Sequence, residues 1–228
     1  MAKSVQTHSI DSSLQERVLG VEWNVQSDEF RFTVSLPMKP RTRRGLLSTM
    51  NSLFDPLGLV ATVILEACSI YRSLCEQELE WDEEMIEKDL HRWEKWLSSL
   101  PQLCNVSFPR CLNLNSYENM QKCQLHIFAD ASTTGCGGVC YLRAVDRNGN
   151  VTCTLAMSQA RLVPKGETSI PRLELIVAVT AVQLEGHVKR KLNLDLRPSI
   201  FWTDSTVVLQ SIRNERKRFL RSFLDGWP

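Results

Sequence analysis

The segment Cys123–Asp130 constrains the fold of this chain more than any other. Its side chains alternate in character, as they do in a β-strand, where successive residues point to opposite faces of the sheet. The segment ends in a carboxylate and is followed at once by the small, turn-forming residues 131–135. The pattern predicts a strand that brings Asp130 to a cleft, with Leu125, Ile127 and Ala129 on one face and Gln124, His126, Phe128 and Asp130 on the other.

The residues that follow predict an antiparallel meander of strands and then a helix, a strand and a helix. Asn148-Gly149 joins two of the expected strands, and Asn-Gly is the strongest short hairpin signal. Because a helix precedes the fourth strand, this strand is expected to run parallel to the first. The expected elements are strands 123–130, 137–145, 151–157 and 199–203, a helix with Pro171 in its first turn, and a helix capped by Ser205 that runs to about Ile212.

Three acidic residues occupy comparable positions in these elements. Asp130 ends the first strand, Glu174 lies in the first turn of the helix, and Asp204 follows the fourth strand. Each has an ordinary explanation by itself: a turn residue, a complement to the helix dipole and a helix start. Together, their positions in this topology predict that the three carboxylates converge to hold divalent metal for phosphodiester chemistry.

The N-terminal half predicts a β-hairpin followed by helices. The hairpin strands 18–25 and 30–35 should dock on other structure, because an isolated hairpin is marginal in water. Helical spacing begins after Pro40. The first expected helix runs through Phe54, and the second, over about 57–78, is introduced by Asp55-Pro56. The third, over about 83–98, follows Asp82 and carries Trp93 and Trp96 in its apolar stripe. Residues 101–120 are expected to be a linker.

The composition predicts a globular intracellular protein. The 228 residues are 43% apolar, and with a net charge of +1 any nucleic-acid binding must come from local basic patches. No apolar run is long enough to span a membrane, and the N-terminus lacks the apolar core of a secretory signal. The eight cysteines include no Cys-x-x-Cys pair, which favours reduced thiols over a disulfide framework or a zinc site. The expected location is the cytoplasm or the nucleus.

Two basic clusters are candidates for contact with nucleic acid, and each is also explained as a solvated surface. The first cluster is Lys39, Arg41, Arg43 and Arg44; it crowds a helix start, where positive charge opposes the helix dipole. The second, near the end of the sequence, is Arg213, Arg216, Lys217, Arg218 and Arg221.

His126 shares a strand face with Asp130. It is therefore either a neighbour that supports the metal ligands or a structural histidine.

Several short segments resemble those of a known family. Phe128–Ser132, Ile170–Leu175 and Trp202–Ser205 are similar to the acidic segments of the ribonuclease H fold. Further segments upstream resemble the region between polymerase and ribonuclease H in polyproteins of BEL/Pao-type LTR retrotransposons. They are Leu19–Trp23, Leu47-Ser48, Phe54–Gly58, Trp81-Asp82 and the helix with Trp93 and Trp96, so that the resemblance covers roughly residues 18–220.

The resemblance implies an α/β chain: a β-hairpin and a three-helix connection region precede an incomplete, ribonuclease H-like mixed sheet. Residues 1–40 would be an N-terminal tail and a hairpin left from the polymerase palm, 41–120 the thumb or connection region with its linker, and 121–228 a partial ribonuclease H-like domain. The chain would belong to a larger Pol polyprotein.

The same resemblance implies a catalytic role for the three acids. Asp130, Glu174 and Asp204 would hold two Mg²⁺ or Mn²⁺ ions. The metal ions would serve to hydrolyse the RNA strand of an RNA–DNA hybrid.

Two departures from the family pattern keep other functions open. The family's fourth aspartate follows a fifth strand, whereas Glu215 and Asp225 lack a strand before them, so the last strand and helix are expected to be absent. The polymerase signature Tyr-x-Asp-Asp does not occur, so no polymerase activity is expected.

Two functions remain as alternatives to an active ribonuclease H. One is a catalytically inactive retrotransposon-derived protein, nucleic-acid-binding or vestigial. The other is an integrase-type nuclease, whose glutamate would come last instead of second.

Overall fold

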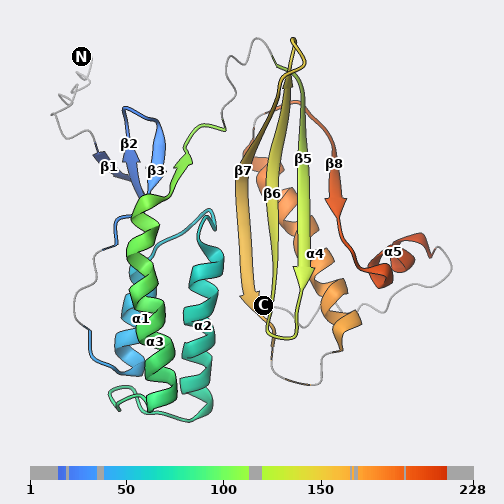
Figure 1. Cartoon of the computed structure of the whole chain (residues 1–228). Helices are drawn as coiled ribbons and strands as arrows, with labels where there is room; N and C mark the ends of the chain where they lie inside the picture. Colours follow the sequence, from blue (N-terminus) through green and yellow to red (C-terminus); the bar gives the residue numbers. More distant parts are fainter. Residues whose placement is uncertain are drawn as a thin grey trace, which may run out of the picture.

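Residues 15–18, 21–34, 39–112, 120–164, 166, 169–192 and 194–214 are described in the computed structural model of the chain. They form two units that lie side by side, each with its own hydrophobic core (Figure 1). The described residues up to 112 are called the helical unit here, and those from 120 onwards the sheet unit. Within the described residues, no helix combines the length and the apolar character needed to cross a membrane.

The predicted hairpin is part of a small antiparallel sheet in the helical unit. Its two strands pair around a turn at residues 25–28, and the second also pairs with a strand from the segment that was expected to be a linker. Val21 and Phe32 are buried in the helical core, so the hairpin is docked as expected. The strands, in their order across the sheet, are β1 (Gln15–Val18), β2 (Val21–Asn24), β3 (Glu29–Arg31) and β4 (Ser107–Pro109).

The three predicted helices are present, but two of them begin later than expected. The Asp55 carboxylate accepts hydrogen bonds from the backbone N–H groups of Leu59 and Val60, which folds residues 55–60 into turns ahead of the second helix. Asp82 does not cap the third helix, because its carboxylate is held by Arg44 at 2.8 Å. The helices are α1 (Arg43–Ser52), α2 (Ala61–Glu76) and α3 (Glu87–Ser99), followed by the 3₁₀ helix η1 (Leu100–Asn105).

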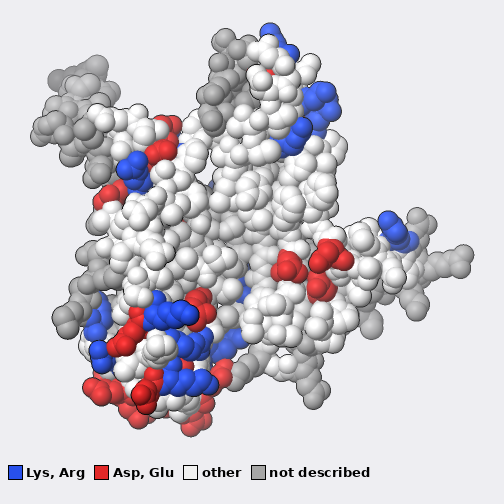
Figure 2. All heavy atoms as spheres, in the orientation of Figure 1, with Lys and Arg blue, Asp and Glu red and all other residues white. Residues whose placement is uncertain are grey.

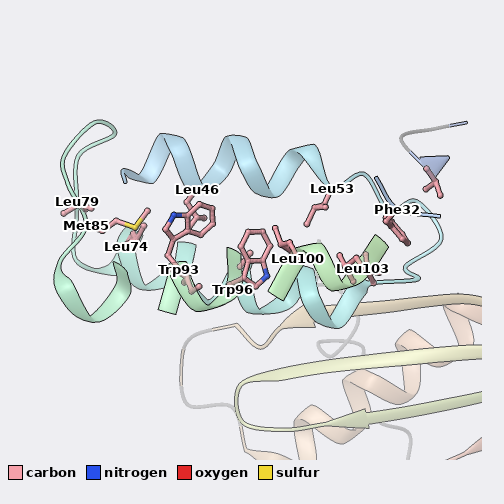
Figure 3. Packing of buried hydrophobic residues seen from close by; sticks show 14 residues of the cluster. Phe32, Leu46, Leu53, Leu74, Leu79, Met85, Trp93, Trp96, Leu100 and Leu103 are labelled. Atoms are coloured by element: carbon pink, nitrogen blue, oxygen red, sulfur yellow. The ribbon is translucent and has the colours of Figure 1, made fainter. Parts of the chain in front are cut away.

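The helical core is built around two stacked tryptophans. The rings of Trp93 and Trp96 lie 5.2 Å apart at an angle of 20°, and both side chains are buried. Figure 3 shows the core as a row of side chains that runs from Leu79 and Met85, past the two tryptophans, to Phe32 beside the small sheet. The predicted packing role of Trp93 and Trp96 is confirmed.

The sheet unit has the predicted order of elements, with longer strands. Three antiparallel strands are followed by a helix and by a strand that runs parallel to the first. The sheet order is β7-β6-β5-β8. The elements are β5 (Met120–Ala131), β6 (Gly135–Asp146), β7 (Val151–Leu162), α4 (Ile170–Lys191), β8 (Leu196–Trp202) and α5 (Thr206–Arg213). Residues 215–228 lie outside the described part of the chain, so the expected lack of a further strand stays a prediction.

One face of this sheet is covered by α4, which lies behind the strands in Figure 1. Leu125 and Ile127 of β5 point to that side and are fully buried in a cluster with Leu184 of α4, as the alternation predicts. On the opposite face, Phe128 is 42% exposed. Among the described elements, none covers this face as α4 covers the other; it is called the open face here, and it is the face to which Asp130 belongs.

Main-chain contacts join the two units where α2 lies against β7. Ser158 donates its backbone N–H to the carbonyl oxygen of Leu57 at 2.9 Å and its hydroxyl to the carbonyl oxygen of Gly58. Gly58 has a φ of 71°, and a side chain there would clash with the Ser158 carbonyl oxygen. At the other end of α2, Arg72 donates to the carbonyl oxygen of Val163 at 2.5 Å. These contacts place α2 beside the open face.

Candidate metal centre

The three predicted acids come together at one end of the sheet unit. Asp130, Glu174 and Asp204 each offer a carboxylate oxygen, and these oxygens all lie within 4.8 Å of one another. Asp130 and Asp204 are exposed, and Glu174 is half-buried. The predicted convergence is therefore confirmed as geometry, while the catalytic role of the three residues stays a prediction.

The strand ends hold the two aspartates in place. Asp130 Oδ1 accepts the backbone N–H of Ala131 at 2.7 Å, just before a turn in which the Ser132 hydroxyl donates to the carbonyl oxygen of Gly135. Asp204 lies between β8 and α5, and the next residue, Ser205, caps α5 by accepting the N–H of Val208. The carboxylates are thus carried by short turns on two adjacent, parallel strands.

Glu174 comes from the first turns of α4 and differs from the other two acids in its burial. Pro171 suits this helix start because it lacks the N–H that would have no partner there, and the neighbouring Leu173 is buried under the helix. The Oε2 atom of Glu174 is buried and accepts no hydrogen bond. Burial, followed by the negative charges of Asp130 and Asp204, raises the pKa of Glu174.

These properties fit a divalent cation. Crowded carboxylates repel one another, and a buried carboxylate oxygen without a donor leaves a charge that is not compensated. A hard cation such as Mg²⁺ takes carboxylate oxygens as ligands and would supply the missing partner. Within the described residues, no other group of three or more His, Cys, Asp or Glu side chains meets the same geometry. Asp130, Glu174 and Asp204 are therefore the residues that could hold metal.

His126 does not belong to this centre. Its Nδ1 accepts the indole N–H of Trp202 at 3.1 Å, and its ring is stacked on that indole. Burial, with a smaller contribution from the positive charge of Arg143, lowers the pKa of His126. His126 precedes Asp130 by four strand residues, or about 13 Å. Of the two roles considered for it, the structure shows the structural one.

The cysteines have no part in the centre either. All eight are free, in agreement with the predicted reduced state. Cys136 and Cys140 are buried on the α4 side of β6, where burial raises the pKa of the Cys140 thiol to about 12. Cys153, expected among apolar residues, is exposed.

The first predicted basic cluster is engaged within the helical unit. Arg41 pairs with Glu94 at 2.9 Å, and Arg44 with Asp82. Arg43 lies over the ring of Trp81 and donates to a backbone carbonyl, while Lys39 is exposed. Of the second cluster, Arg213 is exposed in the last turn of α5, and Arg216, Lys217, Arg218 and Arg221 lie outside the described residues. The nucleic-acid-binding role of both clusters stays a prediction.

Asp130 lines a groove, as its predicted position at a cleft requires, but the wall that α2 contributes was not predicted from the sequence. An open groove of about 680 Å³ runs between α2 and the open face of the sheet and ends at Asp130 and Asp204. Ala61 and Thr62 of α2 form one wall, and Phe128 and Trp202 lie on the sheet side; the other lining residues are Ala129, Gly137, Gly138, Val139, Leu155, Ser158, Gln159, Ala160 and Thr203. The alternation in β5 already placed Phe128 on the Asp130 face, but the α2 wall depends on tertiary packing.

A meander, a covering helix and a parallel fourth strand, with acids at these three positions, define a ribonuclease H-like fold. The chain belongs to the Pao family: the model for the Pao retrotransposon-like RNaseH-like domain matches residues 42–205. The predicted resemblance to Pao-type retrotransposon Pol is thereby confirmed. The match covers most of the helical unit as well as the sheet unit.

Two solved structures are similar to this chain in fold. The foamy viral protease-reverse transcriptase in complex with double-stranded DNA has a TM-score of 0.50 over 91% of this chain, at 12% identity. The foamy viral protease-reverse transcriptase dRH, also in complex with double-stranded DNA, has a TM-score of 0.49 over 92% of this chain, at 13% identity. The chain spans 40% and 34% of the lengths of these two proteins. No curated protein matches the sequence.

Proposed function

We propose that this ribonuclease H-like region of a retrotransposon Pol protein cleaves the RNA strand of an RNA–DNA hybrid by metal-dependent hydrolysis. The observation that carries the proposal is the meeting of three carboxylates within 4.8 Å, one of which has a buried oxygen without a hydrogen-bond donor. Such an arrangement is costly for a purely structural site, because each charge repels the others. It is favourable for a site that holds cations.

In this proposal Asp130 and Glu174 would be the principal ligands of two ions, and Asp204 would support one of them. When bound, Mg²⁺ or Mn²⁺ ions would supply an activated water and neutralise charge on the leaving oxygen. The protein contributes the positions of the ligands. The N–H of Ala131 orients the Asp130 carboxylate, and the helix start at Pro171 presents Glu174 towards the two strand ends.

The proposed substrate is a duplex, recognised by shape and by 2′-hydroxyl groups and not by base sequence. Two observations support nucleic acid as the substrate class: the Pao family membership and the similarity in fold to a reverse transcriptase that was solved on double-stranded DNA. Arg213 is exposed in the last turn of α5, the helix that follows Asp204, and we propose that it contacts the phosphate backbone of the duplex.

The division of the chain is also a proposal. We assign residues 1–40 to a tail and a hairpin derived from the polymerase palm, residues 41–120 to the thumb or connection region, and residues 121–228 to the ribonuclease H-like domain. The two separate hydrophobic cores support a boundary near residue 120. The remainder of a Pol polyprotein would be the natural partner of the chain.

The test is a cleavage assay on a labelled RNA–DNA hybrid with Mg²⁺ or Mn²⁺. Wild-type protein should release shortened RNA, and both EDTA and Asp130→Asn should abolish the product. Asp28→Asn provides a matched control, because Asp28 is an aspartate of the helical unit paired with Arg110, and its loss should leave cleavage intact. Absence of product from pure wild-type protein would contradict the proposal and favour the inactive, nucleic-acid-binding alternative.

A further inference from the structure

The turn between β5 and β6 follows directly on Asp130 and is closed by a small set of hydrogen bonds. Ser132 donates its backbone N–H to the carbonyl oxygen of Gly135 at 2.8 Å, and its hydroxyl accepts the N–H of Gly135 at 3.1 Å. The carbonyl oxygen of Thr134 accepts the N–H of Val163, the residue after β7, at 3.1 Å. The turn that carries Asp130 is therefore tied to the end of β7.

Helix α2 of the helical unit contacts the same corner of the sheet at two points. Arg72 donates its Nη1–H to the carbonyl oxygen of Val163 at 2.5 Å, while the N–H of Val163 is bound to Thr134. Seven residues earlier, and therefore on the same side of the helix, Leu65 packs on the backbone of the turn. A Cβ atom at Gly135 would come within 3.1 Å of Leu65 Cδ2. One contact is polar and the other apolar, and both belong to the helical unit.

The helix start that carries Glu174 lies at this corner too. Leu173, the residue before Glu174, is buried and lines the same pocket as Arg72, Thr134 and Val163. The contacts of Arg72 thus lie beside the supports of two of the three carboxylates.

Arg72 meets the corner through the main chain. A hydrogen bond from a charged donor is roughly twice as strong as one between neutral groups, and its acceptor here belongs to a residue that is only 5% exposed. Figure 2 shows a small group of acids in the lower half of the sheet unit, set among uncharged residues. Because the acceptor of Arg72 is a carbonyl oxygen and not a carboxylate, its influence on the acids runs through the backbone.

We propose that Arg72 is a positioning residue for the metal centre. Through Val163 and Thr134 it fixes the turn that carries Asp130, so that the helical unit sets the affinity of the carboxylates for divalent metal. Metal ligands have to be held within about 0.5 Å of their working geometry by the groups that support them. The inference rests on the proposed function for the identity of the metal centre, but metal binding requires neither substrate nor cleavage.

The first test is titration of the full chain with Mn²⁺, followed by the electron paramagnetic resonance signal of free Mn²⁺. Arg72→Met removes the donors and keeps an apolar stem, and it should raise the dissociation constant about tenfold, as loss of groups that orient metal ligands does. Arg72→Lys keeps a charged donor and should restore most of the affinity.

Arg92→Met is the matched control for this titration. Arg92 lines the same pocket, but it donates to Glu66 and Ser69 within the helical unit. Its exchange should leave Mn²⁺ affinity at the wild-type value even where the urea midpoint falls. If Arg72→Met does not fold, Leu65→Ala removes the apolar contact instead, and it should also weaken Mn²⁺ binding.

The second test needs no metal. Hydrogen exchange in EDTA, measured by mass spectrometry, should be severalfold faster over residues 131–135 in Arg72→Met than in the wild type, because the turn loses its outer support. Arg92→Met should not change this segment. The turn at residues 146–150, which joins β6 and β7, is the internal control, and its exchange should match the wild type in both variants.

The proposal would be overturned by a wild type that binds no Mn²⁺, by folded Arg72→Met or Leu65→Ala protein that binds it with unchanged affinity, or by equal losses in Arg72→Met and Arg92→Met. Faster exchange at both turns in Arg72→Met would also overturn it, since Arg72 would then only stabilise the fold. Binding of Mn²⁺ that depends on Arg72, in a protein that cleaves no hybrid, would refute the nuclease proposal alone. Cleavage by a protein whose Mn²⁺ affinity is independent of Arg72 would refute the positioning role alone.

Discussion

In the helical unit, arginines lie against carboxylates; in the sheet unit, charged groups of the open face stand apart from opposite charges. The helical unit has the ion pairs Arg31–Glu29, Arg41–Glu94, Arg44–Asp82, Arg92–Glu66 and Arg110–Asp28. In the sheet unit, Lys189 pairs with Glu185 on α4, away from the open face. Asp130, Glu174 and Asp204 bring their carboxylate oxygens within 4.8 Å of one another, and the charges of Asp130 and Asp204 raise the pKa of Glu174. Like charges held together repel one another, and a bound cation would relieve that repulsion.

The stacked aromatic side chains of the two units differ in their burial. In the helical unit, the two stacked tryptophans are buried, whereas in the sheet unit Phe128 and Trp202 stack in the open. The buried charge of Asp89 in the helical unit has partners of its own: Oδ2 accepts a hydrogen bond from Gln77 at 2.6 Å, and Arg92 lies 3.7 Å from Oδ1, although Oδ1 itself accepts no hydrogen bond. The buried carboxylate of the helical unit thus has an arginine beside it, whereas the three carboxylates of the sheet unit have one another.

The largest effect should come from exchanging an unpaired aspartate for asparagine. Asp204→Asn should lower hybrid cleavage by at least about 10²-fold, as removal of one stabilising group at a reacting centre does. Asp82→Asn removes an aspartate that is also exposed but is paired with Arg44, and it should leave the rate within error of wild type. Initial rates at saturating hybrid would measure both, and equal losses for the two variants would contradict the distinction between the surfaces.

The second effect concerns stability. Trp93→Ala should destabilise the helical unit by about 3–5 kcal/mol, because it leaves a cavity in a close-packed core. Trp202→Ala removes a ring that is 48% exposed, and it should change stability by only about 0.5 kcal/mol. Urea unfolding followed by circular dichroism would measure the two. A comparable loss at Trp202 would show that the open face serves packing.

The third effect concerns the pH dependence of stability in EDTA. The pKa of Glu174 is raised in the folded state, so its stabilising contribution is fully present below the unfolded value near 4.5 and is lost as pH rises through the folded pKa. Glu174→Gln should therefore raise the melting temperature of the metal-free protein at neutral pH. Mn²⁺ should raise the melting temperature of the wild type but not that of the variant. Thermal melts of both proteins, with and without Mn²⁺, would measure this, and a lower melting temperature for metal-free Glu174→Gln would contradict it.

The smallest effect is expected for the exposed ion pairs. Arg41 and Glu94 are both well exposed, and exposed pairs contribute little because water and salt screen them. Arg41→Gln should leave the urea midpoint unchanged within error at physiological salt. A clear loss of stability would mean that the pairs of the helical unit are structural and would weaken the contrast with the sheet unit.

The sheet unit was more predictable from sequence than the helical unit. The alternation of Cys123–Asp130 and the Asn-Gly turn are local signals, so the strand order and the buried face followed from them. The convergence of Asp130, Glu174 and Asp204 followed from topology, because parallel strand ends and the intervening helix start meet at one edge. Five more residues of β7 were missed because they lack a strong alternation, and α2 packs against them.

Long-range contacts explain most of what the sequence did not reveal. Asp82 resembles a helix cap, but Arg44, far away in the sequence, binds it. The strand Ser107–Pro109 was read as part of a linker, because its short sequence gains strand structure only by pairing with Glu29–Arg31. The groove beside the carboxylates has the same origin, since it requires α2 to lie on β7.

The backbone contact at Gly58 limits which substitutions the chain can accept at this position. Leu57 and Gly58 meet Ser158 largely through backbone atoms, so the relative placement of the groove walls depends on one position that tolerates no side chain. A side chain at Gly58 would meet the carbonyl oxygen of Ser158, so the backbone on one side of this contact would have to shift and the spacing of the groove walls would change at that end.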